Sequence, residues 1–152
     1  MADKRRFELF ARFLRERFPQ AKRVFDVAGG MGRLNVELTK AGLEALTYDV
    51  RHKRLPVSFA ERRFSLSEPC ECDLVVGMHP DGAARLIVQY AAKHRRPFAI
   101  VPCCSDDGSP YKTWMKVLRA LAEEAGLQVE EAQLPMAGRA RVLTGSPPTP
   151  PR

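Results

Sequence analysis

Hydrophobic and polar residues follow two periods along this chain. Apolar residues close to helical spacing, with charged residues between them, predict an amphipathic helix at residues 4–18, which Pro19 ends. The same period predicts three further helices, at residues 33–41, 83–94 and 111–125. Short apolar runs between and after them predict strands at residues 23–27, 44–50, 62–66, 72–77, 97–102, 127–133 and 139–144.

The order of these elements predicts the fold class. Short apolar strands that alternate with helices favour an α/β fold, in which helices cover both faces of a mostly parallel sheet. Only a turn separates the last two strands, so they form an antiparallel hairpin. We therefore expect a seven-stranded, mostly parallel sheet with one reversed strand from this C-terminal hairpin.

Length and composition are those of one globular domain. The chain has 152 residues, of which 45% are hydrophobic and 28% are charged. We expect a single domain over residues 1–144. Residues 145–152 contain four prolines and no apolar anchor, and they are predicted to be a disordered tail.

No apolar run approaches the roughly 20 residues that a membrane span requires. Charged residues also interrupt the apolar residues of the first helix, which argues against a signal peptide. These features predict a cytoplasmic protein, in which the four cysteines are reduced.

A glycine-rich loop follows the first strand. In open α/β sheets, ligands bind beyond the carboxyl ends of the strands. The dinucleotide fingerprint G-x-G-x-x-G does not fit this loop. With Gly30 as the second glycine, Ala28 and Arg33 occupy the other two glycine positions; with Gly30 as the first, Asn35 occupies the third. A nicotinamide oxidoreductase is therefore disfavoured.

The loop resembles the first motif of the Rossmann-like (class I) S-adenosylmethionine-dependent methyltransferases. That motif, acidic-x-G-x-G-x-G, reads here as Asp26, Ala28, Gly30 and Gly32, so only the first glycine differs. The resemblance implies S-adenosyl-L-methionine as cofactor. It also implies that Asp26 orients the loop and the methionine part of the cofactor, and that the backbone of Ala28, Gly29, Gly30 and Gly32 passes close to it.

The same family carries an acidic residue at the end of the second strand, which accepts hydrogen bonds from the ribose hydroxyls. Asp49 occupies this position, and a carboxylate suits a diol because it accepts two hydrogen bonds. By the same resemblance, Val50 and Leu66 pack on the adenine. A seven-stranded sheet with one reversed strand is also typical of the family, and the resemblance covers residues 20–144.

The segment after the fourth strand faces the methyl group in this family. It reads Gly77-Met78-His79-Pro80-Asp81-Gly82 and lacks the D/N-P-P-Y/F motif of many amino- and base-methylating members. It is more similar to a group with a G-x-H-x-C-G turn here and Pro-Cys-Cys after the next strand, some of whose members act on RNA. We predict His79 as a general base, because its ordinary pKa is near neutrality, and Asp81 as its orienting group or a substrate ligand. Alternatively, His79 caps backbone groups of the turn.

Basic residues exceed acidic ones. There are 25 Lys and Arg against 18 Asp and Glu, for a net charge of +7, which favours a polyanionic partner. Arg51, Lys53 and Arg54 directly follow Asp49, and we interpret them as phosphate contacts. The predicted substrate is RNA, either tRNA or rRNA, while a partner protein or a homodimer stays open. A second basic cluster, residues 93–96, is interpreted as solvated surface.

The cysteines do not predict a metal site. Cys70 and Cys72, and Cys103 and Cys104, lack the two-residue spacing of structural zinc sites, and the two pairs fall at opposite ends of the predicted sheet. A site built from His79, Cys103 and Cys104 is the geometric alternative.

A different class of function also fits the sequence. Ala28 in the first motif and the missing D/N-P-P-Y/F motif are compatible with a catalytically inactive, Rossmann-like module that binds the cofactor together with RNA or a protein. Methyl transfer distinguishes this module from an enzyme.

Overall fold

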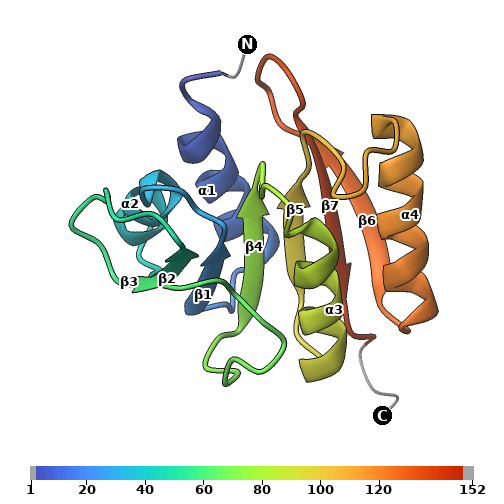
Figure 1. Ribbon diagram of the computed structural model, residues 1–152, viewed down its shortest axis with the longest axis horizontal. Coiled ribbons are helices and arrows are strands. Elements are labelled where there is room, and N and C mark those ends of the chain that lie inside the picture. Colours follow the sequence, from blue (N-terminus) through green and yellow to red (C-terminus); the bar gives the residue numbers. More distant parts are fainter. Residues whose placement is uncertain (1–2, 149–152) are drawn as a thin grey trace.

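The computed structural model describes residues 3–148, which form one seven-stranded sheet flanked by four helices (Figure 1). The strands are β1 (Arg23–Val27), β2 (Glu44–Asp49), β3 (Phe59–Glu61), β4 (Leu74–Met78), β5 (Phe98–Val101), β6 (Gln128–Gln133) and β7 (Arg141–Ser146). The helices are α1 (Arg6–Arg17), α2 (Arg33–Lys40), α3 (Ala84–His94) and α4 (Tyr111–Glu124).

The strand order is β3-β2-β1-β4-β5-β7-β6. Strands β1 to β5 run parallel to their neighbours, and β7 is antiparallel to both β5 and β6. The predicted fold class is therefore confirmed, including the reversed strand. Because β1 and β4 are central neighbours whose connections leave in opposite directions across the sheet, their carboxyl ends form the switch point where ligands bind in open α/β sheets.

Each face of the sheet is covered by two of the helices, as Figure 1 shows. Helices α1 and α2 pack on one face through fully buried leucines, among them Leu14, Leu34 and Leu38. Helices α3 and α4 pack on the other face, where Ile87 and Trp114 are fully buried. The apolar stripes predicted for these helices are therefore the stripes that face the sheet.

The third strand lies earlier than the sequence predicts. The prediction was residues 62–66, whereas β3 pairs Phe59 to Glu61 with the end of β2, and residues 62–66 are irregular. Phe64 is buried as a strand residue would be, but its partners are aromatic side chains rather than a neighbouring strand. The apolar pattern of residues 62–66, which predicted a strand, thus reflects burial of Phe64 by tertiary contacts.

The two connections on either side of β3, residues 50–58 and 62–73, contain no helix. The second of them covers the sheet face near β1 and β2 with the ring of Phe64. Its centroid lies 5.0 Å from the ring of Tyr48 and 4.7 Å from the ring of Tyr90. This loop forms one wall of the cavity described below.

The chain end departs slightly from expectation. Strand β7 extends to Ser146, two residues beyond the predicted strand end at Thr144. Residues 149–152 of the predicted tail lie outside the described residues. Within residues 3–148, no helix has the length and apolar character needed to cross a membrane.

Candidate active site

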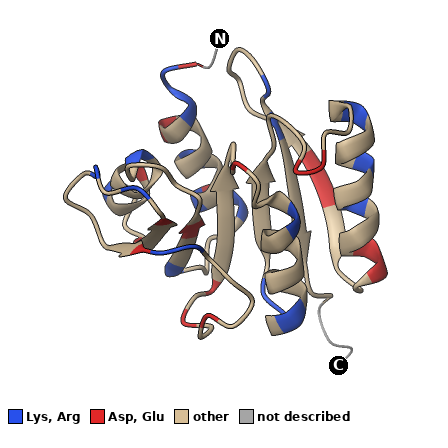
Figure 2. Cartoon of the chain, viewed as in Figure 1, with Lys and Arg blue, Asp and Glu red and all other residues tan. Residues whose placement is uncertain are grey.

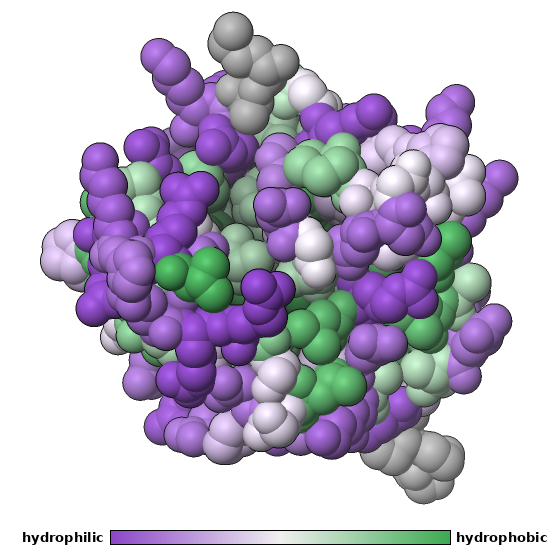
Figure 3. Space-filling view, viewed as in Figure 1, coloured by the Kyte–Doolittle hydropathy of each residue, from purple (hydrophilic) through white to green (hydrophobic). Residues whose placement is uncertain are grey.

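A cavity of about 820 Å³ opens at the carboxyl ends of β1, β2 and β4, a size typical of small-molecule sites. Figure 3 shows a recess on this face of the molecule, with hydrophobic surface inside it and mostly hydrophilic residues around it. The lining residues are Arg6, Phe7, Val27, Ala28, Gly29, Gly30, Met31, Arg33, Tyr48, Asp49, Val50, Arg51, Arg62, Arg63, Phe64, Met78, His79, Asp81, Gly82, Ala83 and Leu86.

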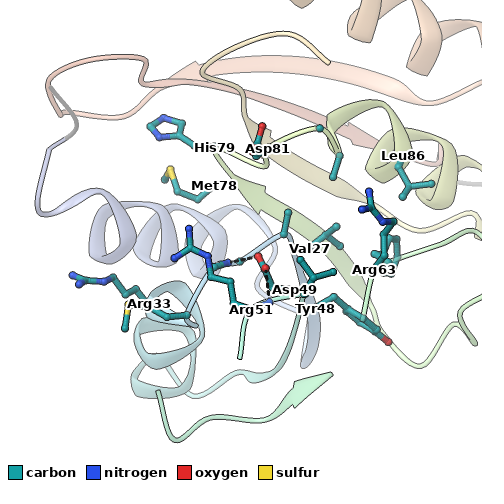
Figure 4. A pocket seen from close by; sticks show the side chains of 18 of the residues that line it. Val27, Arg33, Tyr48, Asp49, Arg51, Arg63, Met78, His79, Asp81 and Leu86 are labelled. Atoms are coloured by element: carbon teal, nitrogen blue, oxygen red, sulfur yellow. Dashed lines mark hydrogen bonds between the residues drawn. The ribbon is translucent and has the colours of Figure 1, made fainter. Parts of the chain in front are cut away.

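The end of β2 holds the glycine loop in place. The backbone N–H of Gly30 donates to Asp49 Oδ2 over 2.8 Å, and that of Gly29 donates to the Tyr48 carbonyl over 3.3 Å. Asp49 Oδ1 accepts from the Arg51 backbone N–H at 3.2 Å, and Figure 4 shows both carboxylate contacts. Each carboxylate oxygen keeps a second lone pair, so Asp49 can accept further hydrogen bonds from a ligand diol.

The loop backbone has the conformation that its glycine pattern suggests. Ala28, Gly30 and Gly32 all have positive φ, at 53°, 63° and 100°. Ala28 therefore has the left-handed backbone that favours glycine, the residue that the motif has at this position. A Cβ added at Gly30 would meet nothing within 4 Å, because this position opens into the cavity. A Cβ added at Gly29 would instead overlap the Asp26 carboxylate below the loop.

Asp26 lies beneath the loop and outside the cavity lining. It is fully buried, and the Thr47 hydroxyl donates to its Oδ2 over 2.8 Å. Its Oδ1 has no hydrogen-bond partner among the described residues. Burial raises the pKa of this carboxyl to about 7, and the nearby Asp49 charge adds to the shift. The structure therefore places Asp26 against the loop backbone and not in the cavity lining.

Asn35 connects α2 to this buried acid. Its side-chain amide lies 3.0 Å from Thr47 Oγ1, 3.2 Å from the Ala45 carbonyl and 3.1 Å from the Ser58 carbonyl. In the sequence analysis, Asn35 appeared only as a mismatch to the third glycine of the dinucleotide fingerprint. The signal that could have identified it is a polar residue on the buried face of a short amphipathic helix.

His79 follows β4 with a left-handed backbone, at φ 49°. Its backbone N–H donates to the Val101 carbonyl over 2.8 Å, and its ring Nε2 lies 3.0 Å from the Arg139 carbonyl. Since a carbonyl oxygen only accepts, Nε2 carries the hydrogen, and in the neutral ring Nδ1 then keeps its lone pair. A histidine held where glycine would be less strained is the kind of outlier found at functional sites.

The cavity brings together most of the predicted site residues, from both halves of the switch point (Figure 4). Those that line it are Ala28, Gly29, Gly30, Asp49, Val50, Arg51, His79 and Asp81. Those outside the lining are Asp26, Gly32, Lys53, Arg54 and Leu66.

The residues outside the lining have other environments. Gly32 precedes the first turn of α2. Arg54 forms an ion pair with Glu61 at 3.0 Å, which occupies one of the three predicted phosphate contacts. Leu66 is 37% exposed, and its carbonyl accepts from the Lys93 ammonium at 3.0 Å.

Of the arginines that line this cavity, Arg51 was predicted as a site residue and the others were missed. Arg33, Arg51 and Arg63 line it, and no described residue forms an ion pair with any of their side chains. Only Asp49 and Asp81 oppose them in the lining. Figure 2 shows basic residues on the loops beside β2 and β3, and a separate group at the far end of α3. The cavity is therefore cationic at its rim.

The structure offers no metal centre within residues 3–148, because no group of three or more His, Cys, Asp or Glu side chains is clustered there. The cysteines lie in two pairs, before β4 and after β5, which are opposite ends of the sheet. Cys103 and Cys104 lie side by side, with their sulfur atoms 3.6 Å apart.

Comparison with known proteins identifies the fold. No protein-family model matches the chain, and no curated protein matches its sequence. Among solved structures, it is similar to the sugar N-methyltransferase KedS8 from Streptoalloteichus sp., with a TM-score of 0.67 and 14% identity over 95% of this chain and 87% of that one.

Two further structures come from different organisms. A ribosomal protein L11 methylase from Lactobacillus delbrueckii subsp. bulgaricus has a TM-score of 0.67 and 18% identity, over 97% of this chain and 80% of that one. Human N-acetylserotonin methyltransferase, in complex with S-adenosylmethionine, has a TM-score of 0.62 and 14% identity, over 95% and 51%. The chain thus has the Rossmann-like methyltransferase fold.

Proposed function

We propose that this protein is an S-adenosylmethionine-dependent methyltransferase. The observation that carries the proposal is the junction of Asp49 and Gly30, the hydrogen bond from the Gly30 backbone N–H to the Asp49 carboxylate. It lies at the cavity edge, where no atom crowds the glycine. This junction lies beside the β1–β4 switch point, the place where open α/β sheets bind ligands.

The residues present fit the cofactor. Asp49 has free acceptor capacity for the ribose hydroxyls, and Val50, which is 57% exposed at the cavity edge, offers an apolar surface for the adenine. The backbone of Ala28 to Gly30 leaves room for the methionine part, since no side chain larger than a methyl group projects from it. When bound, the cofactor supplies a methyl group on a positively charged sulfur.

His79 and Asp81 are the proposed catalytic pair. The proton leaves the substrate nucleophile for Nδ1 of His79, while the Nε2 hydrogen stays bonded to the Arg139 carbonyl. Asp81 lines the same part of the cavity and binds or orients the substrate. Most of the rate enhancement then comes from holding the nucleophile in line with the methyl group.

Calorimetry with S-adenosylhomocysteine tests the cofactor site. We expect binding by the wild-type protein, and at least a tenfold weaker affinity for Asp49→Ala and Gly30→Val. Glu44→Ala is the matched control, because Glu44 lies exposed at the other end of the same strand. No binding at millimolar ligand, or unchanged binding by both site variants while circular dichroism shows them folded, contradicts the proposal.

We further propose that the substrate is RNA, tRNA or rRNA. The support is the cationic rim, where Arg33, Arg51 and Arg63 lack ion-pair partners among the described residues. Phosphates are the natural complement to unpaired guanidinium groups, because they accept paired hydrogen bonds.

Gel shifts over a salt series test the RNA proposal. The double variant Arg33→Ala/Arg51→Ala should weaken binding, and should lower the slope of log affinity against log salt by about 1 to 2, from ~0.7–0.9 per lost phosphate contact. Lys40→Ala/Arg96→Ala removes the same charge from exposed positions at the other end of the sheet, and it should change the slope little. Equal effects of the two double variants argue against a specific rim.

An inactive binding module is the second candidate, because the strained Ala28 replaces the first glycine of the motif. Incubation of labelled cofactor with RNA, protein and small-molecule fractions separates the candidates. Label in any fraction supports the enzyme, whereas cofactor binding without transfer to any of them supports the module.

A further inference from the structure

Three segments that are distant in the sequence meet beside His79. These are the turn after β4, the loop between β6 and β7 (residues 134–140), and the first residue of α4. Arg139 joins them, because its carbonyl lies 3.0 Å from Nε2 of His79 and its guanidinium carbon lies 3.8 Å from the ring centroid of Tyr111. Among the six arginine–aromatic contacts of the described chain, this one is the shortest.

The β6–β7 loop is fixed on both sides of Arg139. On one side, the backbone N–H of Ala137 donates to the Asp3 carboxylate over 3.2 Å. At the base of the loop, the N–H of Leu134 donates to the Ala140 carbonyl over 2.9 Å. Arg139 itself is exposed, and no ion pair holds its guanidinium within residues 3–148. The Tyr111 ring is therefore its main side-chain contact.

We propose that Arg139 is a positioning residue for His79. Between the two backbone bonds that fix the loop, its stacking on Tyr111 holds residue 139 itself, so that the Arg139 carbonyl receives the Nε2 hydrogen and the Nδ1 lone pair is left for the substrate. Arg139 does not line the cavity, so it acts through His79 rather than on the substrate. The proposal rests on the proposed function for its catalytic consequence, but not for its structural part.

The strained backbone of His79 explains why its ring needs a separate contact to hold it. At φ 49° the residue is held by its N–H bond to the Val101 carbonyl, and this bond fixes the main chain only. The ring keeps its own rotations and both neutral tautomers unless a second group binds it. The Arg139 carbonyl is that group, and it binds one nitrogen and one tautomer.

Nuclear magnetic resonance of protein with ¹⁵N-labelled histidine tests the structural part without any cofactor. The chain has three histidines, so the His79 ring signals can be assigned with a His79→Gln variant. We expect a ring N–H signal on Nε2 that is protected from exchange with water in the wild type. Tyr111→Ala should remove that protection, Tyr111→Phe should restore it, and Lys112→Ala should leave it unchanged because Lys112 is exposed on the next position of α4.

Protection that persists in Tyr111→Ala, or a hydrogen found on Nδ1 in the wild type, overturns the proposal. Both results stand even if the protein transfers no methyl group, so failure of this proposal is distinguishable from failure of the proposed function.

Kinetics test the catalytic consequence. If methyl transfer is observed, Tyr111→Ala and Arg139→Ala should lower kcat about tenfold or more while the KM for the cofactor stays within about twofold, since a general base contributes roughly 10²–10⁴ to the rate. Arg139→Lys, which keeps a cation over the ring, should recover part of the loss. A kcat that stays unchanged while the ring protection is lost overturns the role of Arg139 in catalysis.

Discussion

At the residue scale, two non-glycine residues of the cavity have positive φ, and the reason differs between them. His79 has a ring that contacts the Arg139 carbonyl of another loop, and its strained backbone places that ring at the proposed site. Ala28 has only a methyl group, at a position where the related motif has glycine. A left-handed backbone costs an L-residue about 1–2 kcal/mol, and the methyl group of Ala28 makes no hydrogen bond that would offset this strain.

Ala28→Gly should therefore stabilise the protein. Relief of the strain outweighs the greater freedom of glycine in the unfolded chain, for a gain of about 1 kcal/mol in the free energy of unfolding. Denaturant unfolding measures the change. Ala120→Gly, at an exposed position inside α4, is the control and should lose about 1 kcal/mol. A loss of similar size in both variants contradicts the strain at position 28.

Asp26 should make stability depend on pH. Its pKa is raised from 3.8 to about 7, so between these values the folded protein binds a proton that the unfolded chain has released. The resulting stabilisation is complete at about pH 4 and is lost as pH rises toward 7, by up to about 1.4 kcal/mol per pH unit. Relative to Asp26→Asn, the wild type should lose stability over this range and show no further change above it.

Unfolding curves at several pH values measure this difference. Thr47→Val provides the matched test, because the Thr47 hydrogen bond lowers the pKa of Asp26. Its removal should extend the sloping range to higher pH. A difference between wild type and Asp26→Asn that does not vary with pH rules out a titrating Asp26.

At the element scale, predictions held where local sequence determines local structure. The β1 strand was predicted at its observed bounds, and Asp49 was predicted at the end of β2 and lies there. The failures involve contacts between distant segments. Phe64 is buried against Tyr48 and Tyr90, and this burial led to the wrong predicted bounds for β3. Asn35 is explained by its contacts with the Thr47 hydroxyl and with carbonyls of β2 and the following loop.

The Asn35 network ties α2 to the edge of the sheet, so Asn35→Ala should destabilise the protein by about 2–3 kcal/mol. The change removes the amide donor near the buried Thr47 hydroxyl and the Ala45 carbonyl, whereas the Ser58 carbonyl keeps the Thr47 backbone N–H, and each buried unsatisfied group costs about 1–3 kcal/mol. Glu37→Ala, two residues on in the same helix and only partly buried, should cost less than 1 kcal/mol. Denaturant unfolding compares the two, and equal losses contradict a role for the network.

At the scale of the whole molecule, the sequence does not reveal where the charged side chains gather or which segments cover each face of the sheet. The net charge of +7 is spread over both ends of the sheet (Figure 2), and only packing shows which arginines meet at the cavity. Arg6 belongs to α1 and Arg63 to the loop after β3, yet both line it. Their joint position depends on how α1 and this loop pack on the sheet, which no local pattern encodes.

Helices also cover the two faces of the sheet unevenly. Parallel strands are usually connected through a helix, yet residues 50–58 and 62–73 cross between parallel strands without one. Near β1 and β2, the face that carries α3 is closed by the loop of residues 62–73 (Figure 1). Phe64 is the aromatic side chain that this loop contributes, and it is 5% exposed.

Phe64→Ala should therefore cost about 3–5 kcal/mol, the range for removal of a buried phenylalanine, although it lies in a segment without regular structure. Leu66→Ala, two residues on in the same loop, removes a side chain that is 37% exposed and should cost less than about 1 kcal/mol. Denaturant unfolding at one pH measures both. Because Phe64 also lines the cavity, Phe64→Ala should weaken S-adenosylhomocysteine binding more than Leu66→Ala does. If the two variants lose the same stability, the loop does not replace the missing helix, and the sheet face must be stable without it.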